Sequence, residues 1–133
     1  MINRKIILKL IKESAKAKSK SYSPYSKFKV GAAILTKNGS IFSGSNIECA
    51  SFSLTICAER VAAVKAISSG IKKFSAIAIS TNHKGIAFPC GACRQFLIEF
   101  SPDLIVILAD SETKYKIFNL KDLLPNNFYL SEK

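Results

Sequence analysis

In the first part of the chain, apolar side chains recur first at the spacing of a helix and then at the spacing of a strand. Over residues 3–20, isoleucine, leucine and alanine recur at helical spacing with lysines on the opposite side, which predicts an amphipathic helix. Over residues 27–36, Phe28 and every second residue after it are apolar, which predicts a strand with one buried face. Lys-Asn-Gly at 37–39 is a hairpin signal, so we expect residues 40–44 to return antiparallel to that strand.

Predicted helices and short apolar strands alternate through the rest of the chain. We expect helices over about 55–68 and 91–100, strands over 75–80, 104–109 and 114–118, and a last helical turn over 120–124. Two strand–helix–strand steps in this order argue for parallel neighbours in the sheet and for helices on both of its faces. The sequence therefore predicts an α/β fold with three layers, α/β/α, around a five-stranded mixed sheet, in a single domain over residues 1–133.

The composition is that of a globular protein. Hydrophobic residues make up 48% of the 133 residues and charged residues 22%, so the chain can bury a core and is not expected to be disordered. No apolar stretch reaches the ~20 residues that cross a bilayer. The four cysteines, in a reducing compartment, are more often ligands, nucleophiles or core residues than disulfides. We expect a cytoplasmic protein without a membrane partner.

The chain carries a formal charge of +11, which raises the question of a nucleic-acid partner. Seven of the basic side chains, against the single acid Glu13, fall within residues 1–20. A charged segment of this kind is usually the solvated face of a helix. We therefore favour a solvated helix over nucleic-acid binding as the interpretation of this charge.

Three cysteines have the spacing of a metal site. Cys90 and Cys93 form a C-x-x-C pair, which alone fits a redox dithiol, half of a zinc site or chance. Adding Cys57 gives three thiolates, and three protein ligands with one open position are the pattern of catalytic zinc. Because Cys57 and Cys90 each stand at a predicted helix start, the helix dipoles favour the thiolates that zinc needs.

The neighbours of these cysteines decide between a catalytic and a structural site. Glu59, two residues after Cys57, can face the metal without binding it and exchange protons with a water there, although a Glu in a first helical turn is often only a dipole partner. Cys49 is the residue that could close the site as a fourth ligand, which would leave Glu59 without a role. Arg60 and Arg94 could each donate to a sulfur or form surface ion pairs. We favour the sulfur contact for Arg60, and leave both alternatives open for Arg94.

Four motifs in this order resemble the small cytidine deaminases of pyrimidine salvage, the homotetrameric class, over nearly the whole chain. They are Ser-Pro-Tyr-Ser-Lys-Phe-Lys-Val-Gly-Ala-Ala at 23–33, Gly-Ser-Asn-Ile-Glu at 44–48, Cys-Ala-Glu-Arg at 57–60 and Pro-Cys-Gly-Ala-Cys-Arg-Gln at 89–95. A metal ligand-x-Glu followed by Pro-Cys-x-x-Cys is also the general signature of zinc deaminases. The sequence departs from the family at Cys49, where Asn is frequent, and at Phe52, where Tyr is frequent and could bond the sugar 5′-hydroxyl.

The resemblance implies a role for each matching residue. Zinc would be held by Cys57, Cys90 and Cys93, with Glu59 as the proton shuttle and Arg60 beside the sulfurs. The pyrimidine would pack on Phe28 and meet the backbone at Ala58 and Cys90, Asn46 and Glu48 would bind the ribose hydroxyls, and Phe128 would close the site of a neighbouring subunit in a homotetramer.

The expected activity is the zinc-dependent hydrolytic deamination of cytidine and 2′-deoxycytidine, with release of ammonia. A deaminase of cytosine in single-stranded nucleic acid, or of an aminonucleoside antibiotic, is the alternative within the same fold group. A structural zinc-binding module with four Cys ligands is the non-enzymatic alternative. The Asn46 and Glu48 pair, suited to a free ribose, favours the nucleoside.

Overall fold

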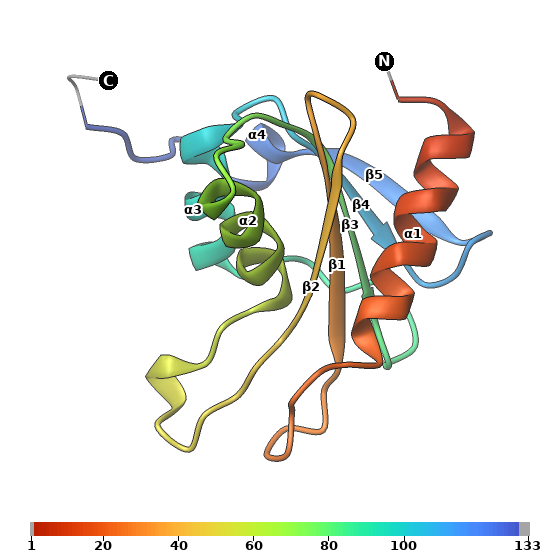
Figure 1. Ribbon diagram of the computed structural model, residues 1–133, viewed down its shortest axis with the longest axis vertical. Helices are drawn as coiled ribbons and strands as arrows, with labels where there is room; N and C mark the ends of the chain where they lie inside the picture. The colour runs from red at the N-terminus through yellow and green to blue at the C-terminus, as the bar shows by residue number, and fades with distance from the viewer. Residues whose placement is uncertain (1, 131–133) are drawn as a thin grey trace.

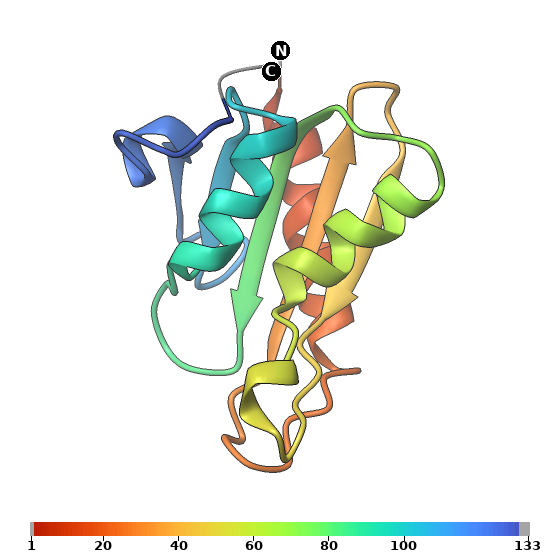
Figure 2. The same cartoon turned by 90° about the vertical axis from the view of Figure 1, so that its left-hand side faces the viewer.

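A computed structural model describes residues 2–130 and shows a five-stranded mixed sheet between helices on both faces, as the sequence predicts (Figures 1 and 2). In chain order the elements are α1 (Arg4–Lys18), β1 (Val30–Thr36), β2 (Ile41–Ser45), the short helix η1 (Phe52–Leu54), α2 (Ala58–Ser68), β3 (Phe74–Thr81), α3 (Gly91–Phe100), β4 (Ile105–Ala109), β5 (Tyr115–Asn119) and α4 (Leu120–Leu123). In this part of the chain, no helix has the length and apolar character needed to cross a membrane.

The strands are arranged in the order β2-β1-β3-β4-β5. The predicted hairpin is confirmed, because β1 and β2 pair antiparallel. Of the two strand–helix–strand steps, the one through α3 joins β3 to its parallel neighbour β4. The step through α2 differs from the expectation, because β1 lies between β2 and β3 and pairs antiparallel with both.

Alternate residues of the central strands are buried on opposite faces of the sheet. On β3, Ile77 and Ile79 pack into the core beneath α2 and α3, whereas Ala76 and Ala78 face α1. Small side chains on the second face let α1 approach closely. At Gly31 the approach is so close that a Cβ atom would lie 2.0 Å from a backbone oxygen of the helix.

The first strand begins later than its apolar alternation predicts. Extended structure starts at Val30, so the expectation that the strand starts at residue 27 and includes Phe28 is wrong. The physical reason lies at Lys27, whose φ of 61° is left-handed and interrupts the extended chain. Phe28 therefore belongs to the loop before β1, where its direction is set by that loop.

Helices α2 and α3 lie side by side on the face of the sheet opposite α1 (Figure 2). Each begins at a cysteine, because Cys57 and Cys90 occupy the extended N-cap positions of the two helices. Gly70 follows α2 with a φ of 101°, the left-handed conformation with which glycine commonly ends a helix. The fold thus brings the two cysteine-bearing helix starts together from distant parts of the sequence.

Candidate metal and substrate site

The three sulfurs of Cys57, Cys90 and Cys93 meet at the starts of α2 and α3. Their Sγ atoms all lie within 4.8 Å of one another. The Cys57 and Cys90 sulfurs are 3.7 Å apart, too far for a disulfide, whose S–S bond is about 2 Å. Two sulfurs at ~2.3 Å from one tetrahedral ion would be separated by roughly 3.8 Å. The donor set and its spacing therefore fit zinc.

Hydrogen bonds within the cluster favour a thiolate at Cys57. The thiol of Cys93 and the Arg60 guanidinium, whose Nη2 lies 3.6 Å from the sulfur, lower the pKa of Cys57 to about 5. The pKa of Cys93 is raised, chiefly because its thiol hydrogen-bonds to Cys57. The Arg60 guanidinium thus contacts the cluster, and no ion pair within residues 2–130 joins it to a carboxylate.

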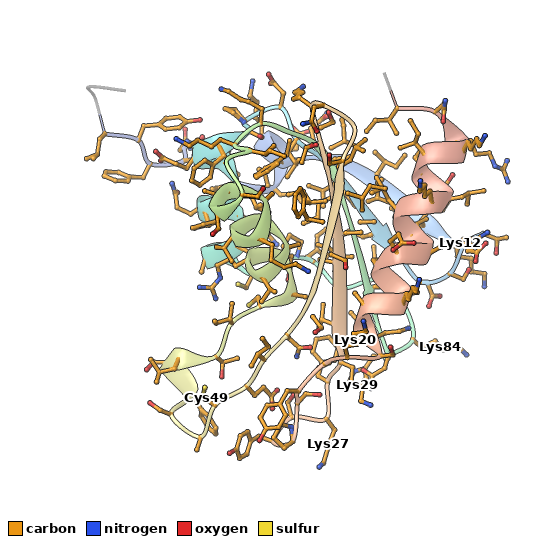
Figure 3. The ribbon with its side chains drawn as sticks, viewed as in Figure 1. Lys12, Lys20, Lys27, Lys29, Cys49 and Lys84 are labelled. Atoms are coloured by element: carbon orange, nitrogen blue, oxygen red, sulfur yellow. The ribbon has the colours of Figure 1, made fainter. Side chains whose placement is uncertain are left out.

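Cys49 lies apart from the three-sulfur cluster. It is half-buried in the loop after β2, and its backbone N–H donates to Thr55 Oγ1 at 3.1 Å (Figure 3). Within residues 2–130, the group of side chains that could hold a metal comprises Cys57, Cys90 and Cys93 without Cys49. The geometry thus leaves one coordination position of a tetrahedral ion to a non-protein ligand.

Glu59 is buried beside the cluster in the first turn of α2. Its side chain is 5% exposed, and burial raises its pKa to about 7. Repulsion from the nearby Cys57 thiolate also raises the pKa, while Arg60 opposes the shift. A carboxyl group that titrates near neutrality can both accept and return a proton at the pH of a cell.

A cavity of about 180 Å³ connects this carboxyl group to the surface. Six of the residues singled out in the sequence line it: Phe28, Asn46, Cys57, Ala58, Glu59 and Cys90. It is smaller than the ~300 Å³ at which drug-sized pockets begin, so it suits a single heterocyclic ring. As the first residue of α2, Ala58 presents a backbone N–H that has no acceptor within the helix.

Two asparagines hold the loop segment that carries Phe28. Asn46 donates from Nδ2 to the Phe28 carbonyl at 2.8 Å and accepts the Val30 N–H at 2.9 Å. Asn82 accepts the Lys29 N–H at 2.9 Å and donates to the Lys27 carbonyl at 3.1 Å. Most of the Asn46 amide is thus engaged by the protein, with one N–H of Nδ2 left to reach a ligand.

Two of the expected substrate contacts are not brought to this cavity within one chain. Glu48 accepts from the backbone N–H groups of Tyr25 and Ser26 and lines a separate cavity with Phe52. The Ser26 hydroxyl also donates to this carboxylate and is the main reason that the pKa of Glu48 is lowered. Phe128 is 66% exposed on the C-terminal segment after α4, where its backbone exchanges hydrogen bonds with the Gln95 side chain of α3.

Within residues 2–130, Arg94 makes neither of the two contacts that the sequence left open, a sulfur contact or a surface ion pair. Its Nε donates to the Pro89 carbonyl at 2.7 Å and its Nη1 to the Leu123 carbonyl at 2.7 Å. The guanidinium also lies 6.0 Å from the centre of the Phe88 ring. Arg94 therefore joins the loop before Cys90 to the end of α4.

Sequence reasoning missed the residues that surround Phe28 and precede the fourth motif, at 89–95. Asn82 fixes the Phe28 segment, the His83 ring meets the Phe28 ring edge-on at 4.6 Å, and Phe88 lines the cavity. All three lie in the loop between β3 and α3, which has no periodic pattern.

Comparison with known proteins identifies the relatives of this architecture. A family model described as "Cytidine and deoxycytidylate deaminase zinc-binding region" matches residues 4–109. A cytidine deaminase of Sporosarcina psychrophila is 45% identical over 121 residues, covering 90% of this chain and 89% of that protein. One of Halalkalibacterium halodurans is 46% identical over 120 residues, covering 90% and 91%.

Solved structures agree with these relatives. The crystal structure of a cytidine deaminase from Burkholderia pseudomallei superposes with a TM-score of 0.86 at 43% identity, covering 90% of this chain and 97% of that one. A cytidine deaminase from Mycobacterium tuberculosis superposes with a TM-score of 0.79 at 36% identity, covering 92% and 96%. The five-stranded sheet with its flanking helices is thus a known architecture.

Proposed function

This chain belongs to the cytidine and deoxycytidylate deaminase family, and we propose that it hydrolyses cytidine and 2′-deoxycytidine to the corresponding uridines and ammonia. The observation that carries this proposal is the buried Glu59 beside three clustered sulfurs, at the inner end of a cavity that accommodates one ring. A structural four-cysteine module would have no use for either the carboxyl group or the cavity.

Zinc is the cofactor of this family region, and Cys57, Cys90 and Cys93 are its proposed ligands. When bound, zinc would supply the Lewis acidity that activates a water molecule near neutral pH. Arg60 would offset the negative charge that three thiolates bring to the site, because its guanidinium contacts the Cys57 sulfur.

Glu59 is the proposed carrier of protons in the reaction. Its carboxylate would accept the proton of the attacking water and deliver it to N3 of the cytosine ring, while the water oxygen bonds to C4. It would then pass the remaining hydroxyl proton to the amino group at C4, so that the C4–N bond breaks and ammonia leaves. Burial raises the pKa of this carboxyl group, which favours its return to the protonated form between the two transfers.

The substrate contacts follow from the cavity wall. The Phe28 ring would pack on the pyrimidine, and the free N–H at the start of α2 would meet the base edge at Ala58, opposite the backbone of Cys90. The remaining N–H of Asn46 would reach the ribose. Glu48 is the second proposed ribose ligand, and it requires the loop that carries it to face the bound sugar.

A homotetramer in the cytoplasm is the proposed state of the protein. Large apolar side chains are exposed around η1, with Phe52 73% and Leu54 64% exposed, and such a patch is typical of an interface between chains. Phe128 would then reach the site of a neighbouring subunit. The free thiols of all four cysteines suit a reducing compartment.

The test is a direct assay of the purified, zinc-loaded protein with cytidine, following the loss of cytosine absorbance and the release of ammonia. Glu59→Gln should retain one zinc per chain and lose at least 100-fold in kcat, in line with the ~10²–10⁴-fold contribution of general acid–base groups. A chelator should abolish turnover, and added zinc should restore it. Wild-type kcat in the Glu59→Gln protein would falsify the role given to this residue.

A further inference from the structure

Four lysines of α1 form a straight row on the side of the helix that faces away from the sheet. Lys5, Lys9, Lys12 and Lys16 recur at intervals of four, three and four residues, and all four are exposed. At 3.6 residues per turn these positions lie within an arc of about 60° and extend over roughly 16 Å. The opposite side of α1 is buried, so the helix has one apolar and one cationic face.

Among the residues that the structure describes, the row has no partner of opposite charge. Within residues 2–130, the ion pair of the structure joins Lys121 to Asp103, and the row takes part in none. Glu13 is the one acid on α1, at the border of the row. Like charges three and four residues apart repel one another and destabilise a helix. An anionic partner would remove this repulsion within the row.

The positive charge continues beyond the helix toward the substrate cavity. Figure 3 shows Lys12 on α1, Lys20 just past the end of that helix, and Lys27, Lys29 and Lys84 at the end of the sheet below it. Hydrogen bonds fix these parts together: Lys18 donates to the Thr81 carbonyl, and the next residue, Asn82, bonds to Lys29. Lys27 and Lys29 flank Phe28, which lines the cavity.

A second cavity lies beside the end of the row. It has a volume of about 280 Å³ and is lined by Lys16, Lys20 and Lys65, with Glu13 as its one carboxylate. The Lys65 ammonium is held at its edge by the Ser43 carbonyl. Three ammonium groups against one carboxylate favour an anionic group at this position.

Two exposed aromatic side chains stand between lysines in the segment that follows the row. Tyr22 and Tyr25 are 56% and 51% exposed, and they stand between Lys20 and Lys27 in the sequence. Proteins that bind single-stranded nucleic acid typically combine lysines, which contact the phosphates, with aromatic rings on which the bases stack. In a duplex the faces of the bases are stacked on one another, so a duplex would contact the lysines but not the rings.

Two other partners fit this surface less well. A helix that binds in a membrane surface needs a free apolar side, and the apolar side of α1 is buried against the sheet. A second copy of the chain would place one cationic row near another, which is unfavourable. Together with the interleaved rings, this favours nucleic acid over a lipid surface or self-association.

We propose that the lysine row of α1 and the segment 20–29 bind single-stranded nucleic acid through its sugar–phosphate backbone, without regard to base sequence. This is a binding surface in addition to the nucleoside site, and it involves no deamination of the strand. The proposal departs from the solvated helix face favoured on the sequence, because four exposed lysines share one side of α1.

The test measures the fluorescence anisotropy of labelled 20-mers of uridylate and of deoxythymidylate with the zinc-loaded protein, between 50 and 200 mM salt, roughly the range in which phosphate contacts are revealed. The row variant is K5Q/K9Q/K12Q/K16Q. Its matched control, K37Q/K72Q/K73Q/K116Q, removes the same charge from exposed lysines elsewhere. Both variants should keep cytidine turnover, which shows that they fold.

Each lost phosphate contact makes the negative slope of log K against log salt shallower by about 0.7. The slope of the row variant should therefore be shallower than that of the parent by up to about 3. The control should stay close to the parent. Equal losses in the two variants would overturn the proposal, because binding would then follow net charge alone. It would also be overturned if polyphosphate of the same length competes as well as the oligonucleotides, if a duplex binds more tightly, or if only anionic phosphatidylserine vesicles bind.

Discussion

Asn82 and Lys29 are joined by two hydrogen bonds that run in opposite directions. The Asn82 side-chain oxygen accepts the Lys29 N–H at 2.9 Å, and the Asn82 backbone N–H donates to the Lys29 carbonyl at 3.0 Å. The same side chain donates to the carbonyl of Lys27. The peptide of Phe28 is therefore fixed on both sides by one residue that lies more than fifty positions later in the chain.

Replacing Asn82 should weaken substrate binding while leaving the metal in place. Asn82→Ala removes two hydrogen bonds from the Phe28 segment, each worth about 1 kcal/mol, so we expect KM for cytidine to rise by roughly 10-fold. Asn82→Asp keeps the acceptor for Lys29 and should have an intermediate KM. Asn119→Ala, at an exposed asparagine whose side chain makes no capping bond, is the control. Zinc content should equal that of the parent, and an unchanged KM in Asn82→Ala would show that the clamp does not position Phe28.

Gly44 should be required for the placement of α2. A Cβ atom at this position would lie 2.6 Å from the Ala62 nitrogen and 2.9 Å from the Ala58 oxygen, both backbone atoms of α2. Gly44→Ala must push α2 away from β2, and we expect a loss of about 1–3 kcal/mol in the free energy of unfolding together with lower kcat. Gly31→Ala is the comparison, because it clashes with α1 instead. It should cost stability but spare kcat, and equal kcat in both variants would contradict the argument.

Arg94 should contribute to metal affinity through the loop that it holds. Its bonds to the Pro89 and Leu123 carbonyls fix the chain directly before Cys90. Supporting residues of this kind typically change metal affinity by about 10–100-fold, and we expect a loss in this range for Arg94→Gln, measured by competition with a chromophoric chelator. Arg94→Lys, which keeps the charge but cannot donate to both carbonyls, should lose nearly as much. Full affinity in Arg94→Lys would show that charge, rather than the two bonds, matters.

The local patterns of the sequence predicted most of the fold, because they concern residues close together in the chain. The helix periods and the hairpin at 37–39 were both predictable in this way. The position of β1 between β2 and β3 was not, since strand order depends on contacts between distant segments. The same reason explains the site: cysteine spacing indicated the metal cluster, whereas the contact between Asn82 and Lys29 had no local signal.

Burial of Glu59 makes the stability of the chelator-treated protein depend on pH. The folded chain holds the Glu59 proton up to a pH of about 7, whereas an unfolded glutamate releases it near 4.5. The folded state thus binds more protons between these values, so the contribution of Glu59 is fully present below about 4.5 and is lost as the pH rises through about 7. The metal is removed for this measurement because its charge would change the pKa.

Glu59→Gln should therefore be more stable than the parent at pH 8, by about 3 kcal/mol, because a neutral amide replaces a carboxylate whose burial is costly. At pH 4.5 the two proteins should be nearly equal. Denaturant unfolding at fixed protein concentration measures both differences, and Glu112→Gln, at an exposed position, should follow the parent at every pH. A Glu59→Gln difference that stays constant from pH 4.5 to 8 would mean that the buried carboxyl group does not carry the raised pKa.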